Sequence, residues 1–189
     1  MKKILAITAL IGVLIACKKD DPSNPGGGGV DVKSLHERLH GTWDIVAISY
    51  SGAANLPPPF DTSVVRPFTG EAEEIVGYYI FDTVPDPSIM TFDVAFKAPM
   101  NFDGGGKITL PVSEGGHATY EVDEAAGMIN GVSYVYGNTS TDTTVVPTQW
   151  EVIENEPTRQ VYATDKNFYF NNDLSKPTLV RMKTTIEKR

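Results

Sequence analysis

The chain has 189 residues, with 16 basic and 24 acidic side chains and a net charge of -8 at pH 7. An acidic protein repels phosphate backbones, so nucleic acid is excluded as an expected partner. The length suggests one domain with an extension, and a single cysteine, Cys17, excludes an intramolecular disulfide.

The first residues have the pattern of a secretory signal. Two lysines precede an apolar run from Ile4 to Leu14. A membrane-spanning helix needs roughly 20 apolar residues, so this run is too short to be one, but it has the length of a signal peptide's apolar region. It ends in Leu14-Ile15-Ala16-Cys17, which resembles the lipobox of bacterial lipoproteins. The resemblance implies a signal peptide over residues 1–16, cleavage before Cys17, and a lipid on its sulfur that anchors the protein to a membrane.

The segment after Cys17 indicates an exported tether. Lys18-Lys19-Asp20-Asp21 resembles the surface-export signal of Bacteroidetes-type lipoproteins, which implies the outer face of the outer membrane. A charged tether is the plainer interpretation. The stretch 22–29 is rich in proline and glycine and has no apolar periodicity, as is typical of flexible linkers. We therefore expect a lipidated tether over residues 17–30 and one domain over residues 31–189.

Residues 31–40 have helical spacing, because Val32, Leu35 and Leu39 fall on one face and Gly41 ends the run. The same segment contains His36-Glu37-Arg38-Leu39-His40, which resembles the zincin metalloprotease signature. Two imidazoles one helical turn apart can bind zinc, and Glu37 would then serve as general base for a bound water.

Two observations count against a zinc peptidase. A catalytic zinc normally has a third protein ligand, and the nearby candidates Glu71, Glu73 and Glu74 have no fixed geometry. The zincin helix also packs under strands that precede it, whereas signal and tether precede His36 here. The sequence therefore predicts no catalytic residue, no metal and no cofactor. His36 and His40 remain weak candidates for adventitious zinc.

Short β-strands replace helical spacing after Gly41. Residues 51–70 contain three consecutive prolines and read as a long loop. Eight to ten strands without intervening helices predict an all-β, antiparallel, up-and-down barrel or a sandwich. The expected strands cover residues 42–50, 74–82, 89–98, 108–112, 118–122, 132–136, 149–153, 160–164, 167–171 and 178–185.

Two features favour the barrel. Gly41-Thr42-Trp43 opens the first strand directly after the short helix, and Arg181 stands in the last strand. This arrangement resembles lipocalins and, more closely, the lipocalin-like domains of Bacteroidetes lipoproteins. In that family Gly-x-Trp opens the first strand, and a basic residue near the end packs over the tryptophan and closes the narrow end. The resemblance implies these roles for Gly41, Trp43 and Arg181. The other short lipocalin motifs are not visible, so Trp43 as a core residue of another β fold is the alternative.

A small closed barrel either fills its interior with side chains or holds one apolar ligand. The large inward candidates favour a packed core slightly. We expect a non-enzymatic, lipid-anchored surface lipoprotein whose barrel binds a small apolar ligand or a glycan; a protein-interaction module with a packed core is the alternative, and the oligomeric state stays open. The candidate pocket residues are Trp43, Met90, Phe92, Phe96, Tyr134, Tyr136, Phe168, Phe170 and Arg181.

Overall fold

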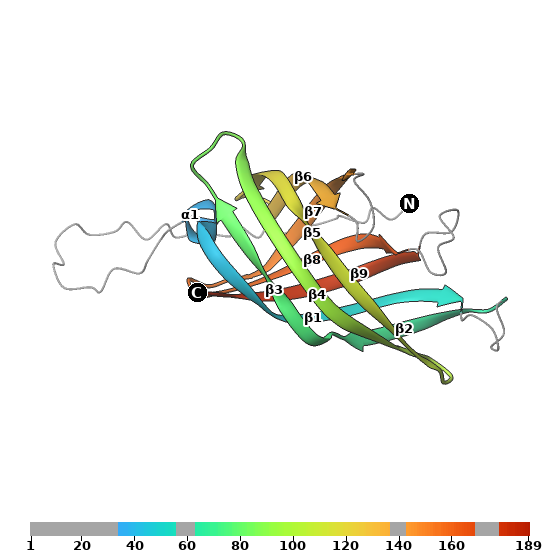
Figure 1. The fold of residues 1–189 in the computed structure, drawn as a ribbon. Coiled ribbons are helices and arrows are strands. Elements are labelled where there is room, and N and C mark those ends of the chain that lie inside the picture. Colours follow the sequence, from blue (N-terminus) through green and yellow to red (C-terminus); the bar gives the residue numbers. More distant parts are fainter. Residues whose placement is uncertain (1–33, 56–62, 137–142, 169–177) are drawn as a thin grey trace, which may run out of the picture. The chain divides into compact units, whose positions relative to one another are not determined.

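The structure is a computed structural model that describes residues 34–55, 63–136, 143–168 and 178–189 (Figure 1). The expected signal peptide and tether, Cys17 included, and Phe170 lie outside these ranges. The elements in chain order are α1 (Leu35–Leu39), β1 (Gly41–Asn55), β2 (Val65–Glu71), β3 (Glu73–Asp82), β4 (Ser88–Phe102), β5 (Lys107–Asp123), β6 (Met128–Tyr136), β7 (Thr143–Asn155), β8 (Arg159–Phe168) and β9 (Thr178–Lys188).

Hydrogen bonds join the strands into a closed ring (Figure 1). Each strand from β3 to β9 pairs antiparallel with the next, and β9 pairs with β1 from Trp43↔Lys188 to Gly52↔Val180. The strands β2 and β3 share one position, because β3 pairs with the first part of β1, β2 pairs with its last part, and both pair with β4. The result is an up-and-down ring of eight positions. The predicted all-β, antiparallel, up-and-down barrel with a short N-terminal helix is confirmed.

Several strands are longer than the sequence predicted. The expected loop over residues 51–70 is wrong at both ends, since β1 continues to Asn55 and β2 begins at Val65. The expected strands at 108–112 and 118–122 are parts of the single strand β5. Gly116 falls between the two expected strands and lies inside β5. A Cβ there would lie 2.1 Å from the Tyr134 carbonyl oxygen and 3.1 Å from the Phe92 ring. Glycine is therefore used at this point for a close approach of two strands.

A β-bulge changes the face of β1. Strict alternation puts Trp43, Ile45 and Ala47 on one face of the strand, and the first two are buried. The register with β9 then shifts between Ile45 and Ala47, so Ala47 is exposed and Ile48 is buried instead. An extra residue in one strand of a pair reverses the facing of all residues after it, and a simple alternating pattern does not reveal where this happens.

The helix and Trp43 fill one end of the ring. Leu35, Leu39 and Trp43 are buried, and the indole Nε1–H of Trp43 donates to the Leu39 carbonyl at 2.6 Å. The Lys188 ammonium lies 5.2 Å from the centroid of the Trp43 ring. The cation over the tryptophan is thus Lys188, and the assignment of this role to Arg181 was wrong. Arg181 lies on the outer face and forms ion pairs with acidic side chains of β7 and β8, Glu151 and Asp165.

A carboxylate far away in the sequence and a local capping box hold α1 in place. Both oxygens of the Glu124 carboxylate, in the turn after β5, accept backbone N–H groups of the helix, from Leu35 at 3.1 Å and His36 at 3.0 Å. Ser34 and Glu37 form a capping box. A helix of five residues is unstable alone because nucleation is costly, so its position depends on these contacts and on its buried leucines.

Replacing Glu124 with alanine should loosen this end of the barrel. The variant leaves two N–H groups at the helix N-terminus without their carboxylate partner, and we expect a loss of about 1–2 kcal/mol in the free energy of unfolding. Urea denaturation followed by tryptophan fluorescence measures it. Glu121→Ala, at an exposed position of β5, is the matched control. Equal midpoints for the two variants would show that Glu124 does not stabilise the helix.

Candidate ligand-binding site

The barrel interior contains a cavity of about 460 Å³. Its volume lies within the range of roughly 300–1,000 Å³ that is usual for small-molecule pockets. Most of its wall is apolar and comes from strands all around the ring. The apolar and aromatic lining residues are Ile48, Tyr79, Phe81, Met90, Phe92, Val94, Phe96, Val112, Ile129, Val135, Val146, Pro147, Trp150, Tyr162 and Met182.

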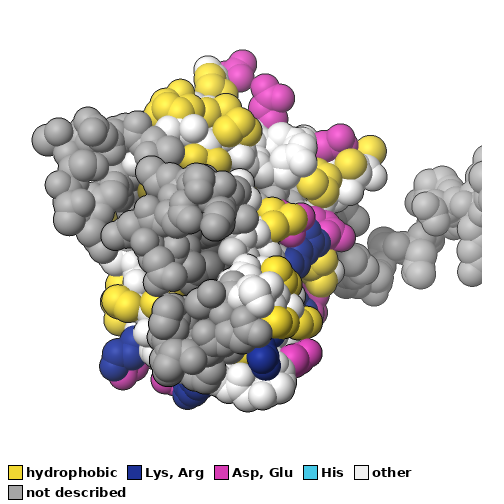
Figure 2. Space-filling view, turned by 90° about the vertical axis from the view of Figure 1, so that its right-hand side faces the viewer, with side chains coloured by type: hydrophobic (Ala, Val, Ile, Leu, Met, Phe, Trp, Pro, Cys, Tyr) yellow, Lys and Arg dark blue, Asp and Glu magenta, His cyan; other side chains and the backbone are white. Residues whose placement is uncertain are grey.

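The cavity reaches the end of the barrel away from α1. Val146, at the start of β7, lines it and is 40% exposed. Val145 and Leu179, at the starts of β7 and β9, are also exposed apolar residues. Figure 2 views the molecule from this side and shows hydrophobic side chains among polar ones on the described part of the face.

The structure brings only some of the predicted pocket residues together. Met90, Phe92 and Phe96 of β4 line the cavity. Trp43 belongs to the filled end, and Arg181 belongs to the outer face, so neither lines it. The side chains of Tyr136 and Phe168 lie outside the described part of the structure, as does all of Phe170.

Tyr134 was predicted to point inward, and this is wrong. It is half-buried and stacks on the His117 ring of β5, with 4.8 Å between the ring centroids. The cavity-lining residues of β6 are Ile129, Ser133 and Val135. The Tyr134 ring suggested the wrong face of β6. Neighbouring residues of a strand point to opposite faces, so an error of one residue exchanges the inner and outer sets.

An ion pair lies inside the apolar wall. The Lys166 ammonium of β8 is 2.6 Å from the Glu114 carboxylate of β5, and both residues line the cavity. Their side chains are 33% and 27% exposed. Burial lowers the pKa of Lys166, but the Glu114 carboxylate and Tyr79 together raise it more, so the net shift is upward and the amine stays charged.

Sequence reasoning did not select Glu114 and Lys166. Each falls at the edge of, or between, two expected strands, where no facing was assigned. The signal that could have found them is the alternation of inward residues. Val112 leads to Glu114 in β5, and Tyr162 leads through Thr164 to Lys166 in β8.

Hydroxyl groups supply part of the remaining polar lining, which also includes Asp165 and Asn167. Ser133 and Thr148 are hydrogen-bonded across β6 and β7 at 3.0 Å, and Thr148 also donates to the Val146 carbonyl at 3.2 Å. The Thr164 hydroxyl donates to the Gln149 carbonyl at 2.7 Å. These hydroxyl groups are satisfied within the protein, so they add little cost to an apolar cavity.

The two histidines of the zinc signature do not converge. The helix ends at Leu39, so His40 is beyond its last turn. His36 Nε2 lies 3.0 Å from the Ser88 hydroxyl, whereas His40 Nδ1 lies 3.3 Å from the Thr83 hydroxyl. Within the described ranges, no group of three or more His, Cys, Asp or Glu residues could hold a metal ion. The geometry that a zinc peptidase needs is not assembled there.

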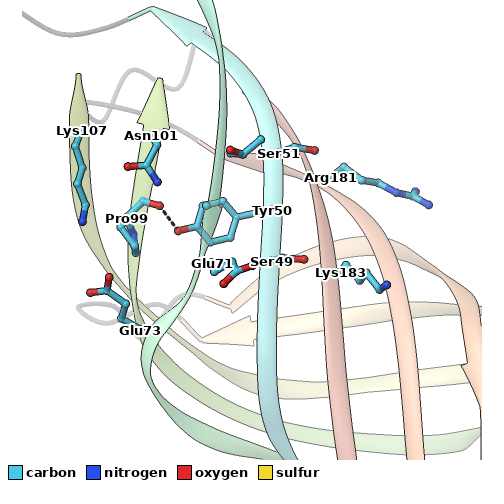
Figure 3. A pocket seen from close by; sticks show the side chains of 12 residues that line it. Ser49, Tyr50, Ser51, Glu71, Glu73, Pro99, Asn101, Lys107, Arg181 and Lys183 are labelled. Carbon is cyan, nitrogen blue, oxygen red and sulfur yellow. Dashed lines mark hydrogen bonds between the residues drawn. The ribbon is translucent and has the colours of Figure 1, made fainter. Parts of the chain in front are cut away.

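A second hollow lies on the outside of the barrel and is less suited to an apolar ligand (Figure 3). This groove of about 640 Å³ crosses β9, β1, β2 and β4, and exposed residues of both charge signs line it, among them Glu71, Lys107 and Lys183. The Tyr50 ring lies at its centre, and its hydroxyl donates to the Pro99 carbonyl at 2.7 Å. A mixed, solvated lining offers little apolar surface to a ligand.

Comparisons with known proteins leave the family open. A scan against protein-family models finds no match, and a search of curated proteins finds none. Among solved structures, the chain resembles EF1p2_mFAP2b bound to DFHBI, with 14% sequence identity, a TM-score of 0.38, and coverage of 82% of this chain and 98% of that chain. At this TM-score the likeness is too loose to bear on function.

Burial protects several phenols from ionisation. It raises the pKa of Tyr79 and Tyr162 in the cavity wall, and the shift of Tyr162 is large. Burial also raises the pKa of Tyr50 and of Tyr120 to about 12. Each phenol has a folded-state pKa above the unfolded value of 10.0, so its contribution to stability is complete below pH 10 and is lost as the pH rises through the folded-state pKa.

The free energy of unfolding should therefore fall steeply above pH 10. Each buried phenol contributes a slope of about 1.4 kcal/mol per pH unit between its two pKa values. Urea midpoints at pH 8, 10 and 11, together with phenolate absorbance at 295 nm, measure this. The variant Tyr120→Phe should show a shallower decline. Full ionisation of the phenols near pH 10 in a barrel that stays folded would contradict the prediction.

Proposed function

We propose that this chain is a non-enzymatic binding protein that holds one small, mainly apolar molecule inside its barrel. The observation that carries the proposal is the unfilled cavity of about 460 Å³, lined by apolar and aromatic side chains from strands around the whole ring. Apolar surface that faces a water-filled space is unfavourable, and a ligand that replaces this water would bury it.

The size of the cavity limits the ligand. Since water occupies about 30 Å³ per molecule in the liquid, the space equals that of roughly fifteen waters. A compact organic molecule fits this volume. The filled end supports the same interpretation, because Leu39 and Trp43 are fully buried and leave the opposite end as the place of entry.

A protein-interaction module with a packed core is the competing function. The cavity counts against it, since the rings expected to fill the interior line a space instead. Exposed apolar residues such as Val145 and Leu179 occur at the cavity end. They fit the rim of an opening as well as a partner surface.

Filling the cavity should prevent binding. Val94 of β4 lines the cavity, whereas its neighbour Ala95 is exposed on the outside. We expect Val94→Trp to weaken binding of the neutral fluorescent probe N-phenyl-1-naphthylamine at least about tenfold, because the indole ring takes up ligand space. Ala95→Trp is the matched control on the same strand. A fluorescence titration measures the affinity, and equal affinities in the two variants would exclude binding in the cavity.

We also propose that the barrel is attached to the outer face of the outer membrane through a lipid on Cys17. The support is the sequence pattern of basic start, apolar run, lipobox and export signal. Within the described ranges, the structure contains no helix that is long and apolar enough to cross a membrane.

Two variants separate lipidation from surface export in a Bacteroidetes host. Cys17→Ser should abolish incorporation of labelled palmitate and release the protein from the membrane fraction, because serine offers no thiolate for the lipid. Replacing Lys19, Asp20 and Asp21 with alanine should keep the label but protect the protein from protease added to intact cells. Incorporation of labelled palmitate into the Cys17→Ser variant would rule out the anchor. Digestion of the alanine variant on intact cells to the same extent as the unmodified protein would rule out the export signal.

A further inference from the structure

The cavity lining includes three charged residues: Glu114 and Lys166 form an ion pair with each other, whereas Asp165 pairs with Arg181 of the outer face. Residues that bind a solely apolar ligand do not need two charges there, since both charges lose hydration when water leaves the cavity. The pair is nevertheless close, at 2.6 Å between the ammonium and the carboxylate. Its partners come from β5 and β8, which are three positions apart in the ring.

The pair has a net charge of zero, and this decides which ligand groups it favours. A ligand carboxylate that approached Lys166 would also approach Glu114, and a ligand ammonium would meet the opposite conflict. In both cases attraction and repulsion over similar distances nearly cancel. A charged ligand would therefore lose its hydration without a compensating gain.

A neutral polar group does not meet this conflict between attraction and repulsion. The ion pair uses one oxygen of Glu114 and one N–H of the Lys166 ammonium. Lys166 has further N–H donors, and the carboxylate has further acceptor capacity. A group that carries a donor and an acceptor side by side can bond to both members at once, and both bonds are then charge-assisted. Primary amides and lactams have this arrangement.

Tyr79 makes the same corner of the cavity selective. It lines the cavity, and its electrostatic neighbours are Lys166 and Glu114. A phenol is neutral at pH 7 even at its usual pKa of about 10, and burial raises the pKa of this one further. The corner therefore holds a balanced ion pair beside an uncharged aromatic ring. Most of the remaining wall, with Phe92, Phe96 and Trp150, is apolar.

We propose, on the basis of the binding function above, that the ligand is an uncharged molecule with an apolar, ring-containing body and an adjacent hydrogen-bond donor and acceptor, as in an amide or lactam. The donor lies against Glu114, the acceptor lies against Lys166, and the body lies against the aromatic wall. The pair thus selects against the free acid and the free amine of the same body.

A matched series of naphthalenes tests this ligand class on the whole protein. The probes are 2-methylnaphthalene, 2-naphthamide, 2-naphthoate and 2-naphthylmethylammonium at pH 7, each in competition with N-phenyl-1-naphthylamine. We expect 2-naphthamide to bind at least about tenfold more tightly than the other three. Glu114→Gln should move the preference to naphthoate, and Lys166→Met should move it to the ammonium probe, because each leaves one unbalanced charge.

Two further variants show whether a change in ligand preference comes from the ion pair or from a general disturbance of the fold. The double variant Glu114→Gln, Lys166→Met removes the ion pair and should lose the preference for 2-naphthamide over 2-methylnaphthalene, whereas both ions should still bind weakly because they lose hydration in the cavity. Lys97→Met removes the exposed ion pair with Glu74 and should leave the order unchanged. If 2-methylnaphthalene binds as tightly as 2-naphthamide, or an ion binds best in the unmodified protein, the ligand class is wrong while the binding function stands. If no probe binds, including N-phenyl-1-naphthylamine, the binding function itself fails.

Discussion

An eight-position ring has an interior that side chains are just able to fill, and this geometric constraint governs the whole molecule. Near α1 the large residues Trp43, Phe81 and Tyr120 are buried, and Phe81 and Tyr120 meet edge to face with 5.7 Å between their centroids. Farther along the barrel the inward residues are still large, but they line a space. The same ring is therefore packed at one end and hollow at the other, and the fold and the candidate site are two results of one arrangement.

Polar groups differ between these two ends. At the packed end Gln160 is fully buried, and its amide donates to Asn155 and to the Glu156 carbonyl, each at 2.8 Å. Its hydrogen bonds are all local, as expected for a group that fixes a core. The pair of Glu114 and Lys166 instead remains partly exposed to the cavity. A structural polar group is enclosed by its partners, whereas this pair keeps capacity for another molecule.

The sequence predicted the class and layout of the fold well, because alternation and turn residues are local signals. It predicted less well which individual side chains point into the barrel. The bulge before Ala47 and the facing of Tyr134 depend on the register with neighbouring strands, which no local pattern contains. Arg181 was chosen for the cation over Trp43, although Lys188 is the residue whose register places it there. Met90, Phe92 and Phe96 were found because β4 alternates without interruption from Ser88 to Ala98.

The pairing of β1 with β9 also determines when the barrel can form. A ribosome makes β1 first and β9 last among these strands, so one side of β1 has no partner until nearly the whole domain has been synthesised. Loop closure over such a separation is slow, and an unpaired strand edge attracts other chains. The growing polypeptide is thus most open to misassembly in the interval before Thr178–Lys188 is released. A chaperone that covers β1 until its last partner arrives would limit such misassembly.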